Sequence, residues 1–90
     1  MKTYTYTAFD GHPDNGGKSI PPMTDKHIKA RDSYQALERA QDQTERYVTG
    51  SCDYVGAHRY YIRVWRDGLP LNVGYVDIEL NPRQVKWGIA

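Results

Sequence analysis

The stretch HRYYIRVWRDGLPLNVGYVDIEL, residues 58–80, decides the fold of this 90-residue chain. Two runs rich in β-branched and aromatic residues, 57–66 and 74–80, flank a turn-forming segment, and this pattern predicts a β-hairpin. With a period of two, one face of the first strand carries Tyr60, Ile62 and Val64. The other face alternates cations with aromatic rings: Arg59, Tyr61, Arg63 and Trp65. Such a face is either a binding surface or the solvated back of a sheet.

One way to close this hairpin is a two-residue turn at Asp67-Gly68, which is a strong short-range hairpin signal. It would pair Ile62 with Val73, and the cations of the first strand would then face uncharged residues and be free to meet phosphate. However, it turns the later apolar residues of the second strand to the polar face unless Gly74 lies at a bulge. It also places Pro70 within the ladder, where proline is disfavoured.

The alternative is a seven-residue loop over residues 67–73. It pairs Ile62 with Ile78 and keeps one face apolar throughout, without a bulge. On the other face it pairs Arg63 with Asp77, and each cross-strand pair of this kind contributes roughly 0.2–1 kcal/mol. We favour this register because one face stays continuously apolar. In it, two cations remain unpaired at the strand ends: Arg59 and Arg66.

The clearest helix signal follows Asp32, which forms a capping-box pattern with Gln35. Gly50 stands where a residue ending the helix is expected. Between them, residues suited to a buried face recur at helical spacing: Leu37, Ala40, Thr44 and Tyr47. The sequence therefore predicts one amphipathic helix before the hairpin.

The remaining segments predict further strands and one loop. Residues 2–9 alternate and are rich in Thr and Tyr, and the short run 26–30 is compatible with a second strand. Residues 10–25 are rich in Pro and Gly, which predicts a long flexible loop. Residues 85–89 alternate, which is compatible with a last short strand or with a packed coil. We expect a single α+β domain over residues 1–90, a small antiparallel sheet of three to four strands with one α-helix packed on one face, in the order β-(β)-α-β-β.

The composition excludes several classes of function. The net charge is +1, which is unlike a strongly basic DNA-binding domain. A lone Cys52 excludes a disulfide framework, and the three His residues lack metal-ligand spacing, so we expect neither a metal nor another cofactor. Asp77 and Glu79 share a face and could form an acid–base pair, but ion pairing with the neighbouring arginines is more common. We therefore expect a protein that is not an enzyme.

The N-terminal residues contain no long apolar run, which argues against a signal peptide or a membrane helix. We expect a complete small protein that works in the cytoplasm, away from the membrane. Its basic residues must then act through local clustering. If 26–30 is extended, Lys29 and Arg31 share a face and could join Arg59 and Arg66 in a positive patch that attracts phosphate or an acidic protein. The candidate partner-binding residues are Lys29, Arg31, Arg59, Tyr61, Arg63, Trp65 and Arg66.

In overall character the chain resembles the small phage-encoded anti-CRISPR proteins. It is a compact chain rich in Tyr and charge, with HIKARDSYQALERAQ (residues 27–41) leading from a strand into a helix and YYIRVWRDG (60–68) opening a hairpin. The resemblance implies an inhibitor in the host-cell cytoplasm that docks on a CRISPR effector complex and blocks target-DNA binding as a competitor or mimic of nucleic acid. Its partner would be a protein or ribonucleoprotein complex.

A second reading is a small nucleic-acid-binding module, for DNA or RNA, that uses the cation–aromatic face. Binding to duplex DNA would then weaken with salt by a slope of about −0.9 per phosphate contact. The oligomeric state does not follow from the sequence.

Overall fold

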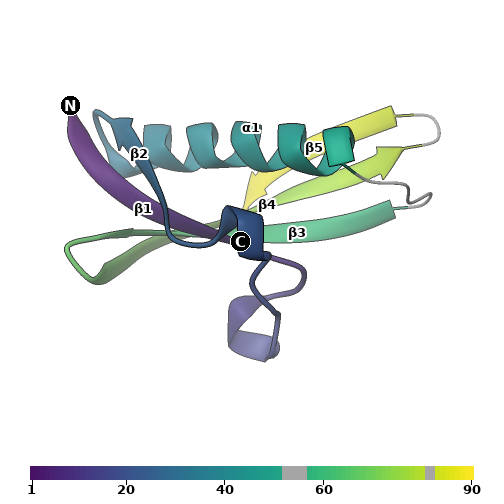
Figure 1. The fold of residues 1–90 in the computed structure, drawn as a ribbon, viewed down its shortest axis with the longest axis horizontal. Coiled ribbons are helices and arrows are strands. Elements are labelled where there is room, and N and C mark those ends of the chain that lie inside the picture. The colour runs from purple at the N-terminus through teal and green to yellow at the C-terminus, as the bar shows by residue number, and fades with distance from the viewer. Residues whose placement is uncertain (52–56, 81–82) are drawn as a thin grey trace.

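One antiparallel sheet and one long helix form the fold (Figure 1). The computed structural model describes residues 1–51, 57–80 and 83–90. Within these ranges the strands are β1 (Lys2–Phe9), β2 (Lys26–Ala30), β3 (Ala57–Arg66), β4 (Leu69–Leu80) and β5 (Arg83–Ile89). They lie in the order β2-β1-β3-β4-β5, and helix α1 (Ser33–Ser51) crosses one face. The predicted α+β architecture is confirmed, with five strands in place of three to four because residues 83–89 form a full strand.

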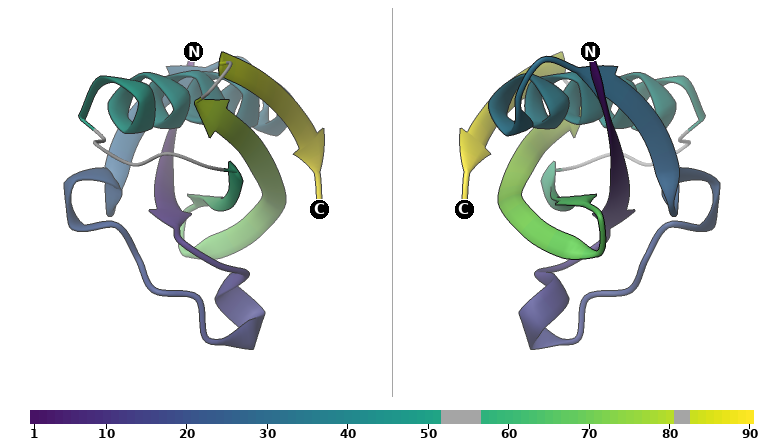
Figure 2. Two further views of the ribbon diagram at one scale, coloured as in Figure 1. Left: turned by 90° about the vertical axis from the view of Figure 1, so that its right-hand side faces the viewer. Right: turned by 90° about the vertical axis from the view of Figure 1, so that its left-hand side faces the viewer.

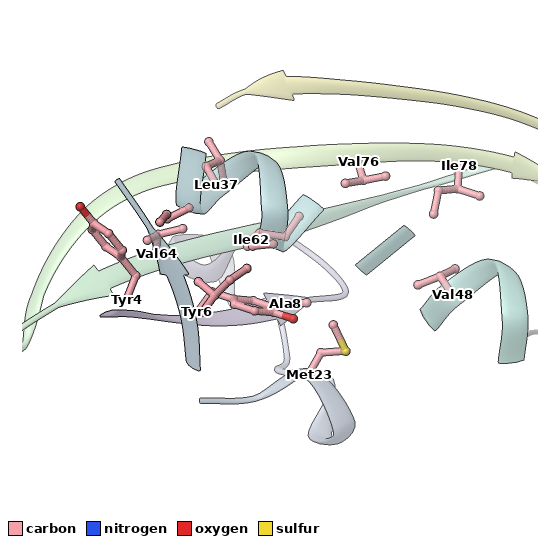
Figure 3. Close-up of a cluster of buried hydrophobic side chains, with 14 residues drawn as sticks. Tyr4, Tyr6, Ala8, Met23, Leu37, Val48, Ile62, Val64, Val76 and Ile78 are labelled. Atoms are coloured by element: carbon pink, nitrogen blue, oxygen red, sulfur yellow. The ribbon is translucent and has the colours of Figure 1, made fainter. Parts of the chain in front are cut away.

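The core lies between α1 and the concave side of the curved sheet (Figures 2 and 3). Period-two alternation along the strands supplies the sheet side of the core: Tyr4, Tyr6, Ala8, Ile62, Val64, Val76 and Ile78. The helix supplies Ala36, Leu37, Ala40 and Val48. Ile62 and Val64 are fully buried, so the predicted apolar face of β3 is confirmed.

The predicted capping pattern starts the helix. The Asp32 Oδ1 atom accepts a hydrogen bond from the Gln35 backbone N–H at 2.8 Å. The Gln35 Oε1 atom in turn accepts from the Arg31 N–H at 2.9 Å, so two backbone donors at the helix start are satisfied. The helix continues one residue past Gly50, to Ser51.

The β3–β4 hairpin closes through the two-residue turn, so the prediction of a seven-residue loop was wrong. Asp67 and Gly68 both have positive φ, 53° and 78°, as a type I′ turn requires. The register then shifts by one residue: Trp65 pairs with Pro70 and Val64 with Asn72, which leaves the intervening Leu71 as the extra residue of a bulge. Pro70 is tolerated here because β4 begins to pair with β5 only at Gly74.

This bulge resolves the conflict between the turn and the apolar face. The extra residue reverses the alternation of β4, so that Val76 and Ile78 return to the core side, opposite Tyr60 and His58. Both are at most 1% exposed. The bulge lies beside the turn and not at Gly74, where the two-residue register required one. A single extra residue near the hairpin tip therefore makes the two-residue Asp67-Gly68 turn compatible with a continuous apolar face.

The loop between β1 and β2 folds against the sheet through two short 3₁₀ helices, Pro13–Asn15 and Pro21–Met23. Its ends are joined: the Asp10 N–H donates to the Lys18 carbonyl at 2.9 Å, and the Lys18 N–H donates to Asp10 Oδ1 at 2.8 Å. Gly17 lies so close to Gly11 that a Cβ atom on Gly17 would be 2.0 Å from the Gly11 carbonyl oxygen. The expected flexibility of this loop stays a prediction.

Candidate functional site

The side of the sheet away from α1, here called the outer face, carries the predicted cation–aromatic row. From β3 it receives Arg59, Tyr61, Arg63 and Trp65, and from β4 Tyr75, Asp77 and Glu79. The loop after β1 lies against part of it, because Asp14 and His12 contact β3. The outer face therefore combines the β3–β4 hairpin with a loop that is distant from it in sequence.

Arg59 is the most constrained cation of the outer face. Its Nε and Nη2 atoms donate to the two carboxylate oxygens of Asp77 at 2.6 and 2.9 Å. Its guanidinium also lies 4.0 Å from the centroid of the Tyr75 ring, a cation–π contact. The predicted pairing of Arg63 with Asp77 was wrong, as was an unpaired Arg59, because the two-residue turn and the bulge together set Arg59 directly opposite Asp77.

This geometry fixes the charge of Asp77. Hydrogen bonds from Arg59 hold the pKa of the Asp77 carboxyl below its usual range, and they raise the pKa of Arg59 further above neutrality. Asp77 is therefore ionised at neutral pH and bonded to Arg59. The acid–base pair of Asp77 and Glu79 considered from the sequence is not tested by this arrangement.

Arg63 has a partner that the sequence did not reveal. Its Nη2 atom donates to Asp14 Oδ1 at 2.8 Å, and this hydrogen bond lowers the pKa of Asp14. Next to it, the His12 ring meets the Tyr61 ring edge-on at 4.9 Å. Asp14 and Arg63 are 49 residues apart, and no spacing rule connects them. The only sequence signal was the pair of glycines, Gly11 and Gly17, whose close approach closes the loop.

Three of the predicted partner-binding residues lie at the opposite end of the sheet from Arg59: Lys29, Arg31 and Arg66. Lys29 pairs with Thr3 on β1, close to Thr5, which pairs with Trp65. Arg59 precedes Trp65 by six residues, roughly 20 Å along a strand. The structure therefore does not bring Lys29 and Arg59 into one patch.

Two further cations are close to acidic neighbours in the sequence. Arg31 lies 3.7 Å from Asp32, and Arg66 lies 4.0 Å from Asp67 and 5.8 Å from the Tyr4 ring centroid. Exposed pairs of this kind contribute little to stability. They leave Arg31 and Arg66 accessible at the hairpin end of the sheet, separate from the Arg59 pair.

A shallow cavity of about 340 Å³ opens beside the Arg59–Asp77 pair. Lys86 and Gln84 of β5 line it, together with His58 and Glu79. Among the described residues, no group of three His, Cys, Asp or Glu side chains could hold a metal ion. Cys52, considered from the sequence as a thiol nucleophile, lies outside the described residues.

Comparisons with protein-family models, with curated proteins and with solved structures found no match for this chain. In the described part of the chain, no helix has the length and apolar character needed to cross a membrane. The outer face, with its fixed side chains, is the candidate functional surface of the protein.

Replacing Asp77 with Asn is expected to make the free energy of unfolding depend less steeply on pH in the acid range. Because the pKa of Asp77 is lowered in the folded state, its ionised form stabilises the fold above the unfolded-state pKa of about 3.9. That stabilisation is lost as the pH falls through the lower folded-state pKa. Urea unfolding followed by circular dichroism between pH 2 and pH 6, an interval of roughly two units on either side of that value, measures it.

The Arg59→Met variant tests whether Arg59 is the cause of the lowered pKa of Asp77. It removes the guanidinium that lowers the pKa of Asp77, so it should produce the same shallower acid dependence as Asp77→Asn. If both variants keep the wild-type dependence of unfolding free energy on pH, the ion pair does not stabilise the folded state in the way inferred here.

Proposed function

We propose that the protein is a non-enzymatic binding protein that docks on a partner complex through its outer face. The observation that carries this proposal is the Arg59 guanidinium, which is held by both oxygens of Asp77 and stacked on Tyr75. Arginine and tyrosine are the residue types that dominate binding energy at protein interfaces. Because these side chains are already fixed, less conformational entropy is lost when a partner binds.

The charge balance of the outer face favours a protein surface over bare nucleic acid. Arg59 and Arg63 each have a carboxylate partner, Asp77 and Asp14. Glu79 adds an exposed negative charge on the same face. A phosphate backbone laid across this face would meet these three acids as well as the two arginines. Polar and aromatic contacts to a protein fit the face better than phosphate neutralisation does.

The partner class comes from the resemblance to anti-CRISPR proteins. We propose a CRISPR effector complex, with the backbone protein subunits of a type I surveillance complex as the docking site. Occupying that site would block target-DNA binding. This action requires no reaction and no cofactor, and a chain with a net charge of +1 can approach a ribonucleoprotein without strong repulsion.

Arg59→Ala is expected to weaken binding to the effector complex by about tenfold or more, which corresponds to about 1.4 kcal/mol. The matched control is Arg46→Ala, because Arg46 also forms an ion pair with an aspartate, Asp42, at 3.1 Å, but on α1. Binding is measured by biolayer interferometry on purified type I complexes, and inhibition by the loss of target-DNA binding.

The possible outcomes test the docking surface and the identity of the partner separately. Binding that Arg59→Ala reduces and Arg46→Ala preserves supports the proposal. Equal affinities for the two variants would show that the outer face is not the docking surface. If no purified complex binds the protein, and the protein leaves CRISPR interference intact in cells, the effector is not the partner. If the captured material is lost on nuclease treatment and binding follows the salt slope of duplex DNA, the nucleic-acid-binding alternative holds instead.

A further inference from the structure

An apolar groove lies between α1 and the edge strand β5, on the side of the sheet opposite to the outer face. Its cavity has a volume of about 390 Å³. Three large side chains in it remain exposed: Tyr34 by 63%, Trp87 by 41% and Ile89 by 65%. Exposed apolar groups gathered in this way usually mark an interaction site.

The groove borders the outer edge of β5, with which no other strand pairs among residues 1–51, 57–80 and 83–90. β5 is the last strand of the sheet, beside α1 (Figure 2). The Ala90 N–H donates to the Val73 carbonyl at 2.9 Å, so the backbone of residue 90 is directed toward β4. Since this direction alternates along an antiparallel strand, the free N–H and C=O groups belong to Val85, Trp87 and Ile89.

We propose that β5 pairs with β5 of a second copy of the chain, antiparallel and centred on Trp87. In this register Val85 of one copy faces Ile89 of the other, and the two Trp87 residues face each other. These are the residues whose backbone groups point to the free edge. The dimer joins the two five-stranded sheets into one, and the second copy's side chains cover each groove.

The sequence of β5 favours a second copy because this register is complementary to itself. On the apolar side, every side chain between Val85 and Ile89 meets another apolar side chain. On the outer side, each Lys86 meets Gly88, over which the Tyr75 ring packs, so no like charge opposes it. A register centred on Lys86 would set two like charges opposite each other, and the backbone groups of residue 86 point toward β4. A two-fold axis at Trp87 satisfies both conditions.

The opposite edge of the sheet is more strongly protected than β5, on which Lys86 is an exposed lysine. β2 exposes Lys26, His27 and Lys29 along its length. In addition, the Arg39 guanidinium donates to the Lys29 carbonyl, which occupies one of its backbone groups. Lysines and covering side chains are the usual means of preventing edge pairing. The contrast points to β5 as the edge that pairs.

The oligomeric state tests the proposal. Sedimentation equilibrium over a concentration series should give a mass approaching twice the chain mass of 10.4 kDa. Ile89→Lys should raise the dimer dissociation constant by about tenfold or more, because it places a charge opposite Val85 of the other copy. Leu69→Lys is the matched control, since Leu69 is also 65% exposed but lies at the β3–β4 hairpin. Circular dichroism establishes that both variants are folded.

Cross-linking tests the register without relying on a disruptive variant. In a chain with Cys52→Ser, a Val85→Cys protein mixed with an Ile89→Cys protein should form the mixed disulfide in preference to either symmetric one. A monomer at all concentrations, a dimer that Ile89→Lys leaves intact, or a dimer that Leu69→Lys weakens equally would overturn the proposal. Preferential symmetric cross-links would overturn it too. The proposal does not depend on the partner assigned to the outer face.

Discussion

Replacing Ile62 with Ala is expected to lower the free energy of unfolding by about 3 kcal/mol, within the range of about 2–5 kcal/mol for such core truncations. Ile62 is fully buried at the centre of β3 (Figure 3). Its cross-strand neighbours are small: Ala8 on β1 and Gly74 on β4. These neighbours have no side-chain atoms that could move into the vacated space, so the cavity persists and the cost is large.

The helix cannot fill that space without displacing other contacts. A Cβ atom on Gly74 would lie 2.8 Å from a Leu37 methyl carbon, which shows how closely Leu37 already packs on this strand. Urea unfolding gives the free energy, and an unchanged m-value would show that the denatured state is unaffected. Leu69→Ala is the control, because Leu69 is 65% exposed. A loss below about 1 kcal/mol for Ile62→Ala, or an equal loss for both, would contradict this account of the core.

The second prediction with a large expected effect concerns the stability of the fold at alkaline pH, where Tyr6 ionises. Burial raises the pKa of Tyr6 to about 12 from an ordinary value of 10.0. The unfolded chain therefore loses this proton at a lower pH than the folded protein does. The contribution of Tyr6 to stability is fully present below pH 10 and is lost between pH 10 and about 12. A shift of two units corresponds to about 3 kcal/mol.

Tyr6→Phe isolates this contribution. The phenol donates a hydrogen bond to the Gln43 side chain, so the variant should lose about 1 kcal/mol at neutral pH. Between pH 10 and pH 12 its stability should fall less steeply than that of the wild type, because it has no buried phenol to ionise. Unfolding free energies across this interval provide the comparison. Parallel curves for the two proteins would show that Tyr6 does not couple folding to pH.

Local sequence patterns were sufficient for the helix, for the strands before β5 and for the two faces of β3. The alternation around Ile62 identified the buried side of β3, because successive side chains of a strand point to opposite faces. The spacing of Asp32 and Gln35 located the start of the helix, because capping satisfies backbone donors within one turn. β5 was recognised only as an uncertain short strand, since its pairing with β4 is a property of the assembled sheet.

The sequence by itself determined which residues are apolar on one side and charged or aromatic on the other. Only the tertiary structure decided which charge meets which. The two-residue turn at Asp67-Gly68 and the one-residue bulge at Leu71 together set the register of β4, and so assign Asp77 to Arg59 in place of Arg63. Asp14 reaches Arg63 from a loop 49 residues away. Both outcomes depend on register and chain closure, which balance small energies over the whole sheet and leave no local pattern in the sequence.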